Sequence, residues 1–362
     1  MLEKYAQLLV HYCLEIKQGE KLFIQTTSLA EPLLREVYRI AVRAGANVEY
    51  QMSFREQNRI FIHESSDVQL DFVPEYNRTI METYDAYLVI RAPFNVREDQ
   101  HNDSAKSAKR QKAMNEINQI YFNRIADKSL KRCLCQYPTM AAAQEAAMSL
   151  EEYEHFVYNA CHLFSNDPQA EWLKVRANQQ YIVDLLNSTD KIRYKNEQTD
   201  ISFSVKERVW INSDGKSNMP SGEIFTGPIE DSVNGVVYFN YPSVYMGHVV
   251  EGVTLEVENG HVTKWHAKTG QEFLNRIFEI DGARHFGEVA IGTNYNIQTA
   301  TKNILFDEKI GGTIHMAIGQ SYKQTGGRNE SPIHWDLITD MTQNGVIYAD
   351  GNIIYRDGVF II

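Results

Sequence analysis

The stretch KLFIQTTSLAEPLLREVYRIAVRAGANVEYQ, residues 21–51, decides the fold of the N-terminal half of the chain. Its first part, residues 21–26, is a short apolar run typical of a strand. Residues 30–44 then carry apolar side chains at helical spacing, which predicts a helix. Gly45 ends this helix, and residues 47–51 form the next strand-like run. The stretch therefore predicts a strand–helix–strand unit.

The same alternation continues along the N-terminal half. Another strand-like run covers residues 84–90, and a long helical stretch follows at 104–126. Strands that alternate with helices are typical of a parallel, layered α/β domain. We expect this domain to occupy residues 1–185, with its boundary inside a helical connector at 169–187.

The C-terminal half has a different pattern, with apolar and polar residues alternating in period two. Residues 253–257 alternate in this way, and Asn259-Gly260 then turns the chain into residues 261–265, which is a strong hairpin signal. Asp350-Gly351 predicts a second hairpin. We expect a strand-rich α+β domain at residues 186–362, with one short helix.

Composition excludes several classes of protein. Among 362 residues, Asp and Glu outnumber Lys and Arg to give a net charge of −11, which argues against nucleic acid as the main partner. A basic stretch at 106–132 is better explained as the solvated face of a helix. No apolar run is long enough to span a membrane, and no signal peptide is recognisable, so we expect a cytoplasmic protein. The four cysteines form no disulfide framework, and a metal-ligand role for Cys133 and Cys135 is disfavoured.

Familiar catalytic and nucleotide-binding motifs are absent. The sequence contains no GxGxxG, no GxxxxGK[ST], no HExxH and no GxSxG. These absences give no support to a nucleotide-binding loop, a single-zinc HExxH protease or a nucleophile-elbow hydrolase.

A set of acidic and imidazole side chains between residues 218 and 337 carries the functional signal. Each member has an ordinary explanation as well. Glu223 would be a turn carboxylate facing water, and Glu288 and Glu308 would be edge charges beside strand-like runs at residues 289–291 and 304–306. A buried histidine would be a core residue with a satisfied partner. The strongest is His315, because it lies inside an apolar run where a buried imidazole needs a partner. His334 and Asp336 are two residues apart, so on a strand they leave the same face. The candidate ligands are Glu223, Glu288, Glu308, His315, His334 and Asp336.

Carboxylates combined with imidazoles, without thiolates, suit divalent cations such as Zn²⁺, Co²⁺, Mn²⁺ or Mg²⁺. Six ligands are more than one tetrahedral ion needs. We therefore expect two divalent metal ions per chain, as in hydrolases that use a pair of ions to activate water.

The motifs resemble those of the aminopeptidase T/aminopeptidase S family of thermophilic metalloproteases over the whole chain. The resemblance is carried by N-M-P-x-G-E-x-F-T-x-P from Asn218, H-x-A-x-G from His315 and N-x-S-x-x-H-x-D from Asn329. It implies that Glu223, Glu288, His315, His334 and Asp336 are metal ligands and that Tyr322 is an active-site tyrosine. In the family pattern an acidic residue lies five positions before the histidine, whereas Glu308 lies seven before His315, with Gly311-Gly312 between them. A bulge or a wider turn would bring Glu308 to the metal.

The resemblance implies a metalloaminopeptidase that removes N-terminal residues from peptides and forms a homodimer. Glu223 or Glu288 would bridge the ions, one glutamate would also transfer a proton, and Tyr322 would donate a hydrogen bond to the oxyanion. Two alternatives stay open. One is another dinuclear hydrolase acting on phosphoesters or amides, and the other is a non-enzymatic interaction protein.

Overall fold

The computed structural model describes residues 1–362 and divides into two units. Unit 1 comprises Met1–Gln169 and Gly215–Pro220, and unit 2 comprises Ala170–Asp214 and Ser221–Ile362. This division is based on compactness and does not test whether either part folds independently. The domain boundary predicted at residues 185/186 therefore stays a prediction. The short segment Gly215–Pro220 was not foreseen as part of the N-terminal unit.

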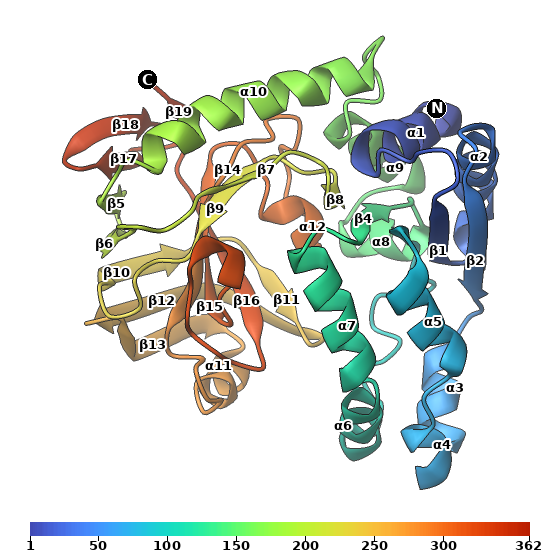
Figure 1. Ribbon diagram of the computed structural model, residues 1–362. Helices are drawn as coiled ribbons and strands as arrows, with labels where there is room; N and C mark the ends of the chain where they lie inside the picture. Colours follow the sequence, from blue (N-terminus) through green and yellow to red (C-terminus); the bar gives the residue numbers. More distant parts are fainter. The chain divides into compact units, whose positions relative to one another are not determined.

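Unit 1 is built on a parallel sheet of five strands in the order β2-β1-β3-β4-β8. Strand β1 pairs in parallel with both β2 and β3, and Figure 1 shows β1 beside β2. The predicted parallel α/β layer is therefore confirmed. The strands are β1 (Lys21–Thr27), β2 (Asn47–Ser53), β3 (Ala86–Arg91), β4 (Lys131–Gln136) and β8 (Asn218–Met219).

Helix α2 (Glu31–Arg43) shows why the strand–helix–strand stretch folds as it does. Its apolar residues lie on one buried face, from Leu33 to Ala41, and a proline occupies its first turn. Gly45 follows with a φ of +85°, a conformation that glycine adopts without strain. The other helices of unit 1 are α1 (Leu2–Gln7), a π-helix (Leu8–Cys13), a 3₁₀ turn (Ser28–Ala30), α3 (Gln57–Glu64), α4 (Asp67–Asp71), α5 (Glu75–Thr83), α6 (Ser104–Ala113), α7 (Asn115–Ala126), α8 (Met140–Glu145) and α9 (Leu150–Ala160).

The helical stretch predicted at 104–126 is two helices rather than one. Met114 joins α6 to α7 with a ψ of −3°, outside the range of a continuous α-helix. Basic side chains on these helices have partners within unit 1: Lys109 lies 3.2 Å from Asp67 and 3.3 Å from Asp71. The basic stretch is thus partly paired with acidic neighbours.

Unit 2 contains helix α10 (Pro168–Leu186) from Ala170 onward and two antiparallel sheets. The larger sheet has nine strands, and the smaller has five in the order β16-β15-β14-β9-β7. Its strand-rich character is as predicted. The larger sheet consists of β5 (Lys191–Lys195), β6 (Asp200–Ser204), β10 (Asn234–Phe239), β11 (Ser243–Tyr245), β12 (His248–Glu258), β13 (His261–Thr269), β17 (Val346–Ala349), β18 (Asn352–Arg356) and β19 (Val359–Phe360).

The smaller sheet carries the predicted metal-binding region. Its strands are β7 (Ile211–Ser213), β9 (Glu223–Thr226), β14 (Phe286–Gly292), β15 (Thr313–Gly319) and β16 (His334–Asp340). Every residue of β9, β14 and β15 is buried. Alternate residues of β14 to β16, including Val289, Met316 and Leu337, belong to the hydrophobic core of unit 2. The other face of the sheet is therefore left for polar side chains. Three short helices complete the unit: α11 (Gln271–Ile277), α12 (Ile304–Asp307) and a 3₁₀ turn (Lys323–Thr325).

Two further features concern predictions from composition. All four cysteines are free and buried, and none belongs to a group of side chains that could hold a metal ion. None of the helices combines the length and the apolar character needed to cross a membrane.

Both predicted hairpins are present, and their glycines make a matched pair for a stability test. Gly260 has a φ of +77° and Gly351 a φ of +84°, so alanine is strained at both positions. A Cβ at Gly260 would meet the carbonyl oxygen of Glu230 at 1.7 Å, whereas one at Gly351 would meet nothing within 4 Å. We expect Gly351→Ala to lower the free energy of unfolding by about 1–2 kcal/mol, the cost of a left-handed backbone for a residue with a Cβ. We expect Gly260→Ala to lower it by about 1–3 kcal/mol more, because of the added clash. Urea unfolding curves measure both, and equal losses would contradict this account of the β12–β13 turn.

Candidate metal centre

Four neighbouring strands of the smaller sheet place their acidic and imidazole side chains on one face. Residues directly opposite one another in an antiparallel pair share a face. Gly292 of β14 lies opposite Glu223, and Ala290 of the same strand lies opposite His315. Ala317 of β15 lies opposite both Glu288 and Asp336.

His334 joins this face because it is two residues before Asp336 on β16. The positions between the polar groups are small: Ala290, Gly292 and Ala317 lie on the same face. The face thus concentrates polar side chains among residues whose own side chains are small or absent.

Glu223 is the first residue of β9 and is 5% exposed. It follows Gly222, which has a φ of +111° and whose Cβ position is blocked by Asn294 at 2.7 Å. The ordinary explanation of Glu223 as a solvated turn carboxylate is wrong, because the Pro- and Gly-rich segment delivers it into a buried strand.

Glu308 reaches the same face from a loop rather than from the sheet. The run Ile304–Phe306, interpreted from sequence as strand-like, is instead part of α12, whose first turn is capped by the side chain of Asn303. The chain then widens into a turn at Gly311-Gly312 before β15 begins. Asn294 pins this turn by donating its N–H to the carbonyl of Lys309 and accepting from the N–H of Gly311, each over 2.9 Å.

Contacts between these side chains form a continuous chain of polar groups. His315 Nε2 lies 3.4 Å from Glu223 Oε2 and 3.2 Å from Glu288 Oε1. The other oxygen of Glu288 lies 3.4 Å from Nε2 of His334, which is 3.6 Å from Asp336 Oδ1. Glu288 therefore faces both histidines, one with each carboxylate oxygen.

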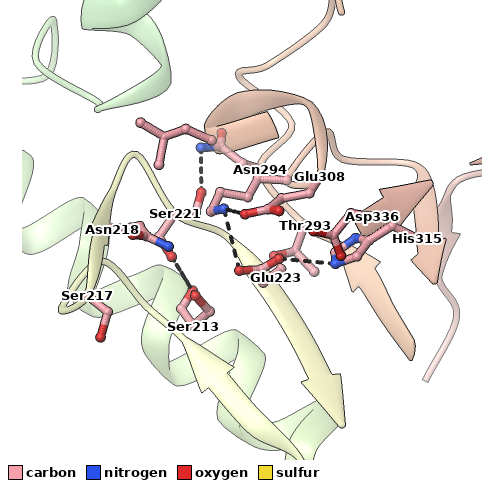
Figure 2. Close-up of polar contacts among 12 residues, drawn as sticks. Ser213, Ser217, Asn218, Ser221, Glu223, Thr293, Asn294, Glu308, His315 and Asp336 are labelled. Carbon is pink, nitrogen blue, oxygen red and sulfur yellow. Dashed lines mark hydrogen bonds and ion pairs between the residues drawn. The ribbon is translucent and has the colours of Figure 1, made fainter. Parts of the chain in front are cut away.

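The six predicted ligands fall into two groups of three. Glu223, Glu308 and His315 offer one set of ligand atoms, and Glu288, His334 and Asp336 offer the other. Within each group these atoms lie within 4.8 Å of one another. Figure 2 shows Glu223, Glu308, His315 and Asp336 gathered together. The structure thus brings all six residues together, while their coordination of ions stays a prediction.

Atoms without hydrogen-bond partners indicate that the donor set suits cations. Glu223 Oε2, His315 Nδ1 and Asp336 Oδ1 are buried and make no hydrogen bond. Buried polar atoms normally have partners, so three such atoms in one cluster need an explanation. His334 also has its Nδ1 2.7 Å from the carbonyl oxygen of Gln320, to which that nitrogen can donate. This contact leaves Nε2 facing the cluster, as in many metal-binding histidines.

The pKa values of the cluster also indicate that it suits a cation. Burial lowers the pKa of His315, but the carboxylates of Glu288 and Glu223, together with that of Asp336, outweigh burial and raise it to about 9. Burial, with repulsion from Glu223 and Asp336, outweighs the nearby ammonium of Lys309 and raises the pKa of Glu308 to about 8. The metal-free cluster therefore retains protons that a cation would replace.

Asp336 and Tyr322 complete the surroundings of the second group. Burial raises the pKa of Asp336, but His334 outweighs it and brings the value to about 2, so this carboxylate is ionised at neutral pH. The Tyr322 ring lies 5.0 Å from the His334 ring and 5.7 Å from the Phe225 ring. The residue is 44% exposed, so it borders the cluster from the solvent side.

Comparison with known protein families identifies the family of this chain. The family model described as "Thermophilic metalloprotease (M29)" matches residues 1–360. The chain belongs to the thermophilic metalloprotease (M29) family. This membership and the two ligand groups are consistent with the resemblance identified from the motifs.

Relatives in this M29 family match nearly the full length of the chain. Aminopeptidase 2 of Geobacillus stearothermophilus is 28% identical, over 99% of this chain and 97% of its own length. Aminopeptidase AmpS of Bacillus subtilis (strain 168) is 26% identical, over 99% and 97%. The solved structure of wild-type AmpT from Thermus thermophilus shares the fold, with a TM-score of 0.86 over 100% of this chain and 99% of its own, at 23% identity.

Sequence reasoning missed one residue of the centre, Lys309. Its side chain is 0% exposed, contacts Glu308 Oε1, and lies 3.5 Å from Glu223 Oε1. A lysine that follows a glutamate in sequence is usually exposed to solvent together with it. The sequence signal for burial of Lys309 was its apolar surroundings, because Leu305-Phe306 lie shortly before it and Ile310 follows it.

The position of Glu288 between the two groups gives a direct test of the M29 centre. We expect Glu288→Gln to lower the metal content below that of the wild type, because a neutral amide faces both histidines in place of a carboxylate. Glu251→Gln is the matched control, since Glu251 is an exposed carboxylate of β12. Elemental analysis by mass spectrometry after dialysis measures the bound metal. Wild-type metal content in Glu288→Gln would contradict the assignment.

The raised histidine pKa values give a pH prediction. An ion that binds His315 must displace a proton below pH 9, and His334, whose pKa Asp336 and Glu288 raise despite burial, adds to this competition. Metal affinity should therefore rise with pH between 6 and 8, by about tenfold per pH unit for each proton released. Isothermal titration calorimetry in buffers of different ionisation enthalpy counts those protons. An affinity independent of pH would contradict the protonation described here.

Proposed function

We propose that this chain is a metal-dependent aminopeptidase that removes N-terminal residues from peptides at a centre of two divalent ions. The observation that carries the proposal is the pair of ligand groups on one sheet face, with Glu288 facing the histidine of each. Membership of the M29 family supports it, as do aminopeptidase relatives that align over nearly the whole of both chains. No feature of the site favours phosphoesters over peptides.

The proposed ligands of one ion are Glu223, Glu308 and His315, and those of the other are Glu288, His334 and Asp336. The mixture of carboxylates and imidazoles suits Zn²⁺, Co²⁺ or Mn²⁺, with Mg²⁺ a weaker match to the histidines. When bound, such ions lower the pKa of a coordinated water and polarise a carbonyl group.

The chain's own residues supply positioning and proton transfer. Glu288 would hold the ion of the second group, and its other oxygen, which faces His315, would also be available to an ion in the first group. Glu223 is the proposed proton acceptor, because its buried carboxylate lies on the same face of the sheet as the other proposed ligands. Returning this proton to the departing amine would complete peptide cleavage.

Tyr322 is the proposed donor to the negatively charged oxygen that develops on the scissile carbonyl. Its ring borders His334, and its partial exposure allows substrate to approach the hydroxyl group. A single donor of this kind typically contributes about 10²–10³ in kcat.

The cellular context is also a proposal. Four free, buried cysteines are compatible with a reducing compartment, and we propose the cytoplasm. A net charge of −11 favours peptides over nucleic acids as partners. The homodimer stays a prediction drawn from the family resemblance.

Recognition of a free α-amine is the part of this proposal that is easiest to test. An N-terminal ammonium would be attracted by the carboxylates of the cluster, which would place the first peptide bond beside the reacting groups. We expect stepwise loss of N-terminal residues from a peptide with a free amine and no cleavage of its N-acetylated twin.

Mass spectrometry of both peptides, incubated with metal-loaded enzyme, gives the measurement. Enzyme dialysed against chelator is the control for contaminating peptidases. Comparable internal cleavage of both peptides would overturn the exopeptidase assignment.

A further inference from the structure

Lys309 is the one charged side chain of the cluster to which the proposed reaction gives no role. It is fully buried, and its Nζ contacts the carboxylates of both Glu308 and Glu223. A buried ammonium is costly unless carboxylates compensate it, and these two belong to a proposed ion site. Lys309 and an ion would therefore compete for the same two carboxylates.

The backbone holds Lys309 in this position. Its carbonyl accepts from Asn294 N–H over 2.9 Å, and its own N–H donates to Phe306 over 3.0 Å. Asp307, the residue two positions before it, accepts hydrogen bonds from the N–H and hydroxyl of Thr301 over 2.7 and 2.9 Å. Hydrogen bonds fix the backbone at Lys309 and at Asp307, and the Lys309 side chain has no surface exposed to water.

Lys309 is also what distinguishes two otherwise similar groups. Each group offers two carboxylates and one imidazole. The carboxylates of Glu223 and Glu308 contact the ammonium directly, whereas the ammonium acts on Asp336 from farther away and forms no ion pair with Asp336 or Glu288. With equal donor chemistry, the unequal charge environment decides which group attracts a cation more strongly.

We infer that Lys309 makes the two ion sites unequal, so that the Glu288–His334–Asp336 group holds its ion tightly and the Glu223–Glu308–His315 group holds a weaker, exchangeable one. The inference rests on the proposed two-ion centre. An ion entering the second group must share its carboxylates with a fixed ammonium, and repulsion between the two cations in a buried site lowers its affinity.

Metal titration of the chelator-treated chain tests the inference without reference to activity. Co²⁺ is the probe, followed by visible absorption and by calorimetry. We expect two binding steps whose dissociation constants differ by about tenfold or more. Lys309→Met keeps the length of the side chain and removes its charge, so it should tighten the weaker step by about tenfold or more and bring the steps together.

Control variants assign the steps to the groups. Lys302→Met replaces an exposed lysine just before helix α12 and should give the wild-type curve. Glu308→Gln should weaken the second step, and His334→Ala should remove the first. These two variants keep the assignment testable if circular dichroism shows that Lys309→Met does not fold.

The outcomes separate the inference from the proposed function. Two equal steps in the wild type, or an unchanged separation in folded Lys309→Met, would overturn the role of Lys309 alone. A wild-type chain that takes up one Co²⁺ while Lys309→Met takes up two would be the extreme form of the expected result. Absence of Co²⁺ binding would instead contradict the proposed metal centre itself.

Discussion

Crowding of four carboxylates on one buried face of a sheet is the constraint on which the rest of the site depends. Glu223, Glu288 and Asp336 are each less than 10% exposed, so water cannot stabilise their charges as it does at a surface. Without added cations, the cluster is neutralised by protons on His315 and His334 and by the ammonium of Lys309. The protein is therefore built around a concentration of negative charge that divalent ions can satisfy.

The sheet that carries this charge is stabilised from its other face. Val289, Met316 and Leu337 alternate with the polar residues and belong to the core of unit 2, so the hydrophobic effect supports strands whose other face is electrostatically costly. Strand pairing then sets the positions of the ligands, because the register places Ala317 between Glu288 and Asp336. A rigid, buried sheet is well suited to hold ligands at fixed separations.

Local pattern was sufficient to predict much of this arrangement. Period-two alternation placed His334 and Asp336 on one face, and the Asn259-Gly260 turn was predicted correctly from its own residues. The helix α12 and the burial of Lys309 were not predictable in this way. Both depend on contacts with residues far away or outside the run itself, such as the bond from Asn294 to the Lys309 carbonyl. Sequence spacing left open whether Glu308 could join the cluster, because the turn at Gly311-Gly312 is shaped by tertiary packing.

Anomalous X-ray diffraction from crystals of the zinc-loaded chain, recorded on both sides of the zinc absorption edge, tests the central claim most directly. The account predicts two peaks on the polar face of the β9–β14–β15–β16 sheet. One should lie about 2.0–2.2 Å from ligand atoms of Glu288, His334 and Asp336, and the other at similar distances from Glu223, Glu308 and His315. Zinc bound elsewhere, with both groups lacking an anomalous peak, would contradict the account.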